Sequence, residues 1–222
     1  MINSILNYIK RTRRLSALSD RANCKTLLDV ALHIVSTNKL KKFSVVEIGV
    51  FKGDNAKELA QAMLQYFNIK IFYFGFDLFD DVDYLKENYP EDYKQYNIEE
   101  YPYWEFNSGG HNFSKVSEKL SFIMDEEQFK LYKGDTMKTL PEFVNNELKS
   151  IDLIYIDGCH DYEVVKSDWE NCALLYKNNS KLIILFDDYT YEGVKAVYEE
   201  ILASNKYQLQ IINHNQFIVF LN

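Results

Sequence analysis

The strongest constraint on the fold comes from two apolar runs in the second half of the chain that end directly in aspartates. LIYI is followed by Asp157, and LIILF is followed by Asp187 and Asp188. Short apolar runs of this kind are typical of strands buried on both faces of a parallel sheet. In open α/β sheets, the carboxyl ends of the strands border the crevice where ligands bind. We therefore expect the three carboxylates to meet at one edge of a sheet, together with His160.

Such a group of oxygens is a candidate metal site. A hard divalent cation such as Mg²⁺ binds carboxylates and keeps some positions for water or substrate. The alternative is that Asp187 and Asp188 form a turn or cap the next helix, and that His160 is a helix-start residue with a solvent-facing ring. The combination of Asp157-x-x-His160 with a second strand ending in Asp-Asp favours the functional interpretation.

The rest of the pattern alternates between strands and helices from about residue 43 onward. The expected strands are 43–50, 69–77, 129–134, 151–157, 181–187, 207–213 and 216–221, and the expected helices are 55–67, 137–148, 164–176 and 193–204. This alternation predicts an α/β fold with a Rossmann-like, seven-stranded and mostly parallel sheet that has helices on both faces. The last two strands are separated by a connection too short for a parallel crossover, so they should form an antiparallel C-terminal hairpin.

The domain organisation follows from the same pattern. Residues 1–40 have helical spacing without a strand or a catalytic motif, which indicates an N-terminal helical appendage. Residues 41–222 then form one domain. Within it, 78–128 lacks strand signals and has eight aromatic residues between Tyr84 and Phe106, so we expect a helical lid or substrate wall. The alternative is that these aromatics cover a sheet edge or an oligomer interface, and a homo-oligomer stays possible.

Composition excludes several classes of protein. The chain has 25 basic and 33 acidic residues, a formal net charge of −8, and this field disfavours nucleic acid as a partner. The three cysteines have no Cys-x-x-Cys spacing, so a disulfide framework or zinc site has little support and a reducing cytoplasm fits. No apolar stretch is long enough for a signal or membrane segment, and we expect a soluble protein without membrane insertion.

A glycine-containing turn follows the first expected strand, in the segment Glu47 to Asn55. Gly49 and Gly53 permit a tight turn and the close approach of a ligand to the backbone. The spacing is G-x-x-x-G instead of G-x-G-x-x-G, so the third glycine of the pyrophosphate-binding fingerprint is missing. The turn therefore favours a cofactor without a pyrophosphate and makes a nicotinamide-dependent oxidoreductase unfavourable.

Two further acids end strands at the same expected edge. Asp77 follows the second strand, where an acidic residue can accept hydrogen bonds from ribose hydroxyls, and Asp135 follows the third. Taken singly, each is better explained as a helix cap, because aspartate at a strand-to-helix turn accepts hydrogen bonds from free backbone N–H groups. Taken together with the glycine turn, they favour a cofactor site.

These segments carry a family resemblance. EIGVFKGDNA, GFDLFD, GDT, IDLIYIDGCHDYEVVKSD and LIILFDDY resemble, in this order, the class I S-adenosylmethionine-dependent methyltransferases. Within that group the chain is most similar to metal-dependent O-methyltransferases of the macrocin and mycinamicin type, and more distantly to catechol O-methyltransferase. The resemblance covers roughly residues 40–220, apart from the expected lid and N-terminal helices.

The resemblance implies a cofactor site for S-adenosyl-L-methionine. In the family pattern, Glu47, Gly49 and Gly53 form the turn around the methionine part of the cofactor. Asp77 would bind the ribose, and Asp135 would lie next to the adenine. Each of these assignments is an expectation carried over from the family motif.

The resemblance also implies a catalytic centre. Asp157, Asp187 and Asp188 would hold the metal, with Asp157 also bordering the cofactor, and His160 would be the general base. The base is a lysine in catechol-type enzymes and a histidine in the sugar-modifying ones, so the histidine favours a sugar. We therefore expect Mg²⁺-dependent O-methylation of a hydroxyl on a sugar or other small vicinal diol. The alternative is a catalytically silent binding or scaffold module that keeps the cofactor fold.

Overall fold

The computed structural model describes residues 22–79, 112–146 and 150–221. Most of the expected lid and the first half of the expected N-terminal appendage lie outside these residues. The described part contains every residue that the sequence assigned to the cofactor, the metal or the general base.

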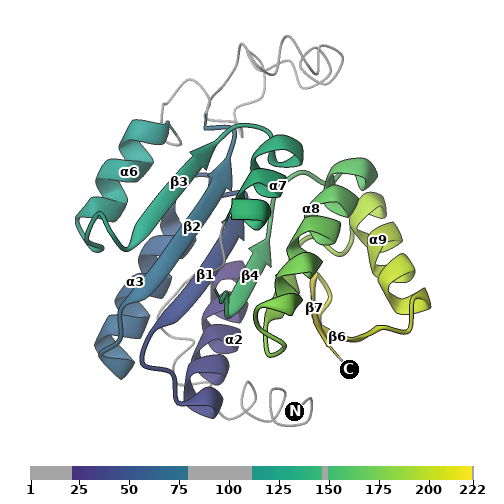
Figure 1. Cartoon of the computed structure of the whole chain (residues 1–222), viewed down its shortest axis with the longest axis horizontal. Coiled ribbons are helices and arrows are strands. Elements are labelled where there is room, and N and C mark those ends of the chain that lie inside the picture. The colour runs from purple at the N-terminus through teal and green to yellow at the C-terminus, as the bar shows by residue number, and fades with distance from the viewer. Residues whose placement is uncertain (1–21, 80–111, 147–149, 222) are drawn as a thin grey trace.

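A single seven-stranded sheet organises the chain (Figure 1). Its strands are β1 (Phe43–Ile48), β2 (Ile71–Asp77), β3 (Phe129–Lys133), β4 (Leu153–Ile156), β5 (Ile183–Phe186), β6 (Tyr207–Asn213) and β7 (Gln216–Leu221). They lie in the order β3-β2-β1-β4-β5-β7-β6. The first five strands are parallel, whereas β7 is antiparallel to both β5 and β6. The predicted α/β fold with an antiparallel C-terminal hairpin is confirmed.

Six α-helices in the described ranges flank the sheet: α2 (Ala22–Asn38), α3 (Asp54–Phe67), α6 (Phe113–Ser121), α7 (Thr136–Asn146), α8 (Tyr162–Leu174) and α9 (Glu192–Ala203). A short 3₁₀ turn, Leu175–Lys177, extends α8. Helices α2, α3 and α6 share one apolar core with one face of the sheet, and α7, α8 and α9 share another with the opposite face. None of the helices in these ranges is both long and apolar enough to cross a bilayer.

Alternation along the strands divides the apolar side chains between these two cores. On β1, Val45 belongs to the α2 and α3 side and Val46 to the α7 and α8 side; on β4, Tyr155 and Ile156 divide in the same way. Successive strand side chains point to opposite faces, so both faces of a central strand must be apolar. This is the reason that the strands appear in the sequence as unbroken apolar runs.

Helix α2 is packed as part of the main folded unit. Its apolar residues from Leu27 to Val35 are almost fully buried and contribute to the core that contains α3 and β1. The side chain of Asn213, at the end of β6, also donates a hydrogen bond of 3.3 Å to the Thr26 hydroxyl. The domain boundary expected at residue 40 stays a prediction, but the second half of the expected appendage shares its core with the sheet.

The ends of helix α3 show why the chain turns where it does. The helix follows Gly53, which has a left-handed φ of 72°, and Asp54 supplies a negative charge in its first turn. Acidic residues are favourable there because the helix dipole is positive at the N-terminus. The helix ends at Asn68, another left-handed residue, whose N–H donates to the carbonyl of Leu64.

The carboxyl ends of β1, β4 and β5 meet at one edge of the sheet, and β7 begins at the same edge because it is antiparallel. The alternation that places Val45, Tyr155 and Leu185 on the α2 side continues past the strand ends. It therefore gives Glu47, two residues beyond Val45, the same facing as Asp157 and Asp187, which are two residues beyond Tyr155 and Leu185. The sheet thus gathers carboxylates at one place.

The buried centre of the sheet should dominate stability. We expect Leu185→Ala, which truncates a fully buried side chain on β5, to lower the free energy of unfolding by about 2–5 kcal/mol through lost burial and cavity formation. Leu202→Ala on α9, where the side chain is 52% exposed, should change it by about 0.5 kcal/mol or less. Urea unfolding followed by circular dichroism measures both, and equal effects would contradict the assignment of the core.

Candidate functional site

The turn between β1 and α3 approaches other parts of the chain so closely that it requires glycine twice. Gly49 has φ 88°, its N–H donates to the carbonyl of Phe76 at 2.9 Å, and a Cβ there would lie 2.0 Å from the backbone oxygen of Asp157. Gly53 has φ 72°, and its Cβ would lie 2.9 Å from Cγ1 of Val116. L-residues with a side chain rarely adopt such φ values. The structure therefore places Gly49 of the predicted cofactor turn beside the end of β4, and Gly53 beside α6.

Glu47 lies beneath this turn with only 2% of its surface exposed. Its Oε1 accepts a hydrogen bond of 2.8 Å from the Asn55 side chain, and its Oε2 accepts one from the Tyr73 hydroxyl. Burial, followed by the charge of Glu47, raises the pKa of Tyr73 well above its usual range. Glu47 thus connects β1 to β2 and to the first turn of α3, which holds the predicted cofactor turn in shape.

Asp77, at the end of β2, is bonded to the same turn. Its Oδ2 accepts a hydrogen bond of 2.8 Å from the backbone N–H of Phe51, and its Oδ1 accepts one of 2.8 Å from Phe79. Phe51 has a left-handed φ of 50°, a conformation that costs free energy in a non-glycine residue. The carboxylate stabilises this turn, and its expected role as ribose ligand stays a prediction.

Asp135, at the end of β3, has the geometry of a helix cap. Its Oδ1 accepts a hydrogen bond of 2.9 Å from the N–H of Met137, and its carbonyl accepts bonds from the N–H groups of Lys138 and Thr139, both at 3.0 Å. Asp135 therefore caps the start of α7, which is the alternative that the sequence offered to a cofactor-binding role. Its expected place next to the adenine is untested by this geometry.

The aspartates that follow β4 and β5 form an electrostatically coupled group with Glu47. Burial raises the pKa of Asp157 well above its usual value, and the negative charges of Asp187, Glu47 and Asp188 raise it further. Nearby like charges disfavour ionisation, so the shift reports that these carboxylates lie close to one another. The three aspartates therefore lie at one edge of the sheet, as expected, and Glu47 lies near them, which the sequence analysis had not expected.

Asp187 is the most enclosed member of the group, with 2% of its surface exposed. Its Oδ1 accepts hydrogen bonds from the backbone N–H of Asp188 at 2.8 Å and from Nδ2 of Asn215 at 2.9 Å. Its Oδ2 accepts bonds from the Tyr155 hydroxyl and from Nε2 of Gln216, the latter at 3.2 Å. A carboxylate has about four lone-pair positions, and all of them are used here.

Asp188 connects this group to the expected general base. Its Oδ2 lies 2.8 Å from Nε2 of His160, and its Oδ1 accepts a bond of 3.0 Å from Nδ2 of Asn215. The hydrogen bond with His160 is the main reason that the pKa of Asp188 lies below its usual value. The His160 ring also stacks on Tyr191, with centroids 3.9 Å apart. Stacking and hydrogen bond together fix the orientation of the imidazole.

The predicted metal ligands do not surround a common position for a cation. Within residues 22–79, 112–146 and 150–221, no three His, Cys, Asp or Glu side chains are arranged to hold a metal ion. Asp187 has no lone pair left for one, because protein donors use all four positions. The donor set of Asp157, Asp187 and Asp188 therefore does not fit a metal as the chain is folded, and Mg²⁺ binding stays a prediction.

Sequence reasoning missed three residues of this network: Tyr155, Asn215 and Gln216. A signal was present, because an antiparallel last strand must begin where the parallel strands end. In the observed register Phe186, the last residue of β5, pairs with Phe217. Asp187 and Asp188, the next two residues, therefore lie opposite Gln216 and Asn215. Asn215, just before QFIVFL, and Gln216, its first residue, were therefore available as candidates once the hairpin had been placed beside β5.

One buried acid on α8 was also missed. Asp168 is 1% exposed, and neither of its carboxylate oxygens has a hydrogen-bond partner among the described residues. Burial raises its pKa to about 7, with a smaller opposing effect from the Thr136 side chain and a further increase from Asp135. Burial, and to a smaller extent the charge of Asp168, raises the pKa of Cys172. Asp168 therefore lies behind the start of α7, next to the expected adenine region.

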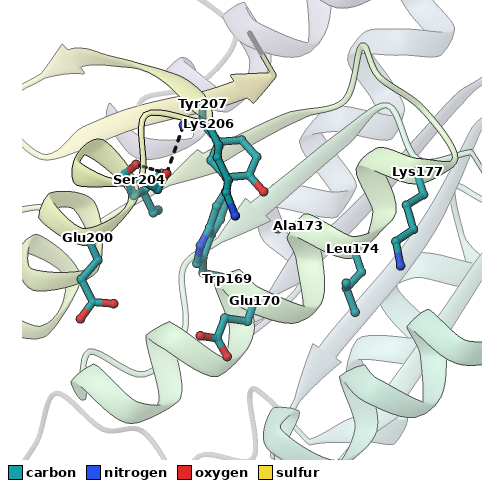
Figure 2. A pocket seen from close by; sticks show the side chains of 10 residues that line it. Trp169, Glu170, Ala173, Leu174, Lys177, Glu200, Ser204, Lys206 and Tyr207 are labelled. Atoms are coloured by element: carbon teal, nitrogen blue, oxygen red, sulfur yellow. Dashed lines mark hydrogen bonds between the residues drawn. The ribbon is translucent and has the colours of Figure 1, made fainter.

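A surface hollow of about 480 Å³ lies elsewhere, between α8 and α9. Figure 2 shows Trp169 and Tyr207 in its wall, with Glu170 from α8 and Glu200 from α9. Its lining comes from the C-terminal halves of both helices, which run back from the carboxyl edge of the sheet. The hollow is therefore separate from the carboxylate group.

Comparison with known proteins places this geometry in a family. A model of the methyltransferase domain matches residues 46–189, a range that contains every predicted site residue but not the Asn215 turn. No curated protein matches the chain significantly. Among solved structures, the O-methyltransferase NovP aligns with TM-score 0.61 and 16% identity, covering 88% of this chain and 78% of its own. An O-methyltransferase from Bacillus cereus in complex with SAH aligns with TM-score 0.54 and 13% identity, covering 99% and 91%. At such identities the two structures support the fold alone.

Asp168 gives the stability of the protein a specific pH dependence. Its folded pKa of about 7 exceeds the unfolded value of about 4, so the folded state binds the proton more tightly, and the free energy of unfolding falls as pH rises from about 4 to 7. We expect Asp168→Asn to remove the contribution of Asp168 to this fall, about 1–4 kcal/mol at pH 8 relative to pH 5. Asp29, whose pKa burial raises to about 6, should keep its own smaller contribution.

Urea unfolding at both pH values measures this difference. Glu170→Gln, an exposed neighbour on the same helix, is the matched control and should keep the wild-type pH dependence. An Asp168→Asn protein whose stability still falls like that of the wild type would contradict the prediction.

Proposed function

The chain belongs to the methyltransferase domain family, and from this premise we propose that it is an O-methyltransferase acting on a hydroxyl of a sugar or other small vicinal diol. Its fold is that of the class I S-adenosylmethionine-dependent methyltransferases, so S-adenosylmethionine is the methyl donor. The choice of oxygen as acceptor and the class of substrate are the parts that we propose. The hydrogen-bonded pair of His160 and Asp188 supports oxygen as the acceptor. The sugar or diol is supported by the histidine itself, which the family resemblance associates with sugar-modifying enzymes.

This pair supports oxygen as the acceptor because a hydroxyl must lose a proton when it is methylated. A carboxylate accepts hydrogen bonds, so Asp188 fixes the imidazole with its proton on Nε2. Nδ1 of His160 is then the ring nitrogen with a free lone pair. Histidine is the side chain that most often serves as general base. The solved structures of the same fold include two that are named O-methyltransferases, which agrees with this choice.

In this proposal, the turn around Gly49 binds the methyl donor, S-adenosylmethionine. Methyl transfer needs the acceptor oxygen in line with the bond between sulfur and the methyl carbon. Positioning two bound reactants in this way can remove about 7–11 kcal/mol of the barrier. The turn lies in contact distance of the Asp157 backbone, three residues before His160, so one short segment connects the expected donor site to the base.

The reaction that we propose is balanced by one proton transfer. The acceptor oxygen forms a bond to the methyl carbon, the bond from that carbon to sulfur breaks, and its electron pair returns to sulfur. The hydroxyl proton moves to Nδ1 of His160, and the resulting imidazolium is stabilised by the Asp188 carboxylate at 2.8 Å. The products are a methyl ether and S-adenosylhomocysteine.

That the methyl-transfer reaction depends on Mg²⁺ is a prediction from the sequence alone. When bound, such a cation would lower the pKa of the substrate hydroxyl. In the structure, the Oδ1 atoms of Asp187 and Asp188 accept hydrogen bonds from Asn215, and none of the steps above depends on a cation. Whether the reaction requires one is a separate experimental question.

A comparison of two histidine variants tests the proposal. We expect His160→Ala to lower kcat for methylation of an acceptor sugar or diol by about 10²- to 10⁴-fold, because the general base is lost. Affinity for S-adenosylhomocysteine should stay within about 2-fold, since the base does not hold the donor. Mass spectrometry of the product and isothermal titration calorimetry measure these quantities. His214→Ala, in the exposed hairpin turn, is the control and should behave like the wild type.

Two outcomes would contradict this function. Full activity of His160→Ala would show that another group takes the proton. Cofactor binding by the wild type without a methylated product from any hydroxyl acceptor would instead support the alternative of a catalytically silent binding module.

A further inference from the structure

We propose that the side-chain amide of Asn215 takes the place of a cation between Asp187 and Asp188, so that the site is assembled and active without a divalent metal. The part concerning activity rests on the proposed function, whereas the part concerning the amide rests on geometry alone. Nδ2 of Asn215 lies 2.9 Å from Oδ1 of Asp187 and 3.0 Å from Oδ1 of Asp188. One nitrogen therefore donates to both carboxylates, which is the bridging position of a shared metal ion.

The orientation of this amide is fixed by chemistry. A carboxylate oxygen can be approached favourably only by the NH₂ end, because the carbonyl end would face two negative charges. The carbonyl end, Oδ1, accepts a hydrogen bond of 3.1 Å from the Thr190 hydroxyl. Both ends of the Asn215 amide therefore have partners that suit them.

The backbone of Asn215 is fixed as well. Its N–H donates to Oδ1 of Asn213 at 2.8 Å, and its carbonyl accepts from the N–H of Tyr189 at 2.9 Å. The second bond continues the pairing of β7 with the residues that follow β5. The bridging amide thus belongs to a rigid hairpin turn, and two elements of the chain determine its position.

A second amide completes the arrangement. Gln216 is 1% exposed; its Nε2 donates to Oδ2 of Asp187 at 3.2 Å, and its Oε1 accepts from the Asn213 side chain at 2.8 Å. Asn215 in the hairpin turn and Gln216 at the start of β7 therefore donate to the two different oxygens of the same buried carboxylate. Buried polar groups are stable only when they are hydrogen-bonded, and these bonds stabilise Asp187 where it lies.

A cation would have to displace these donors. Mg²⁺ requires oxygen ligands at about 2.0–2.1 Å in near-octahedral geometry. Both Oδ1 atoms already face the same Asn215 nitrogen, and Oδ2 of Asp188 faces the His160 ring. The donors that exclude the cation are therefore the same ones that orient the proposed base, which makes Asn215 a positioning residue for His160.

Two substitutions of Asn215 test this inference. Asn215→Asp keeps the size of the side chain but replaces the donor by a third carboxylate, and Asn215→Ala removes the bridge. We expect the wild type, after chelation and dialysis, to keep its methyl-transfer rate within about 2-fold with or without Mg²⁺. Both variants should lose at least about 10-fold in kcat under chelation, and Mg²⁺ should restore much of the rate of Asn215→Asp. His214→Ala, from the same turn, is the matched control.

Titration with Mn²⁺ followed by electron paramagnetic resonance gives a readout that does not need turnover. We expect no stoichiometric binding to the wild type and binding of one ion to Asn215→Asp, whose folding is checked by thermal unfolding. Loss of wild-type activity on chelation with recovery by Mg²⁺, or stoichiometric Mn²⁺ binding to the wild type, would overturn the inference. If no acceptor is methylated at all, the proposed function fails, and the Mn²⁺ titration of the wild type still decides the question of the amide.

Discussion

The arrangement of the site depends on one buried carboxylate that the protein itself must satisfy. Burying an ionised group without partners costs several kcal/mol or more, so Asp187 is tolerable at 2% exposure only with its full set of donors. Those donors come from β4, from the first residue of β7, from the hairpin turn and from its own neighbour. The strand order that inserts β7 next to β5 is therefore a requirement of this carboxylate as well as a feature of the fold.

Local patterns in the sequence were sufficient for most of the fold. LIYI and LIILF predicted strands because a central strand is covered on both faces, and the closing segments 207–213 and 216–221 became β6 and β7 with the expected bounds. Local patterns of this kind do not show which side chains of distant segments contact one another. Asp168 illustrates this limit, because its helix has polar residues on several sides and only the packing of α7 decides that this one is enclosed.

The candidate site, like the fold, could be predicted only in part from the sequence. Which acids gather at the carboxyl edge could be predicted, because each ends a strand and parallel strands end together. What those acids bond to could not, since Asn215 reaches Asp187 and Asp188 only through the register of a strand that is remote in sequence. A motif of aspartates and histidine therefore predicts a location more securely than it predicts a ligand.

The position of β7 has a consequence for how the protein acquires its native state. It is the last strand of the described chain, yet it lies between β5 and β6 inside the sheet. Until it is inserted, Asp187 lacks both amide donors, and nascent chains expose the apolar edge of β5. Pairings between segments distant in sequence form slowly, because closing a long loop costs entropy before any contact is gained. The carboxyl edge of the sheet, with its buried acids, should thus be among the last parts of the protein to reach its native structure during synthesis.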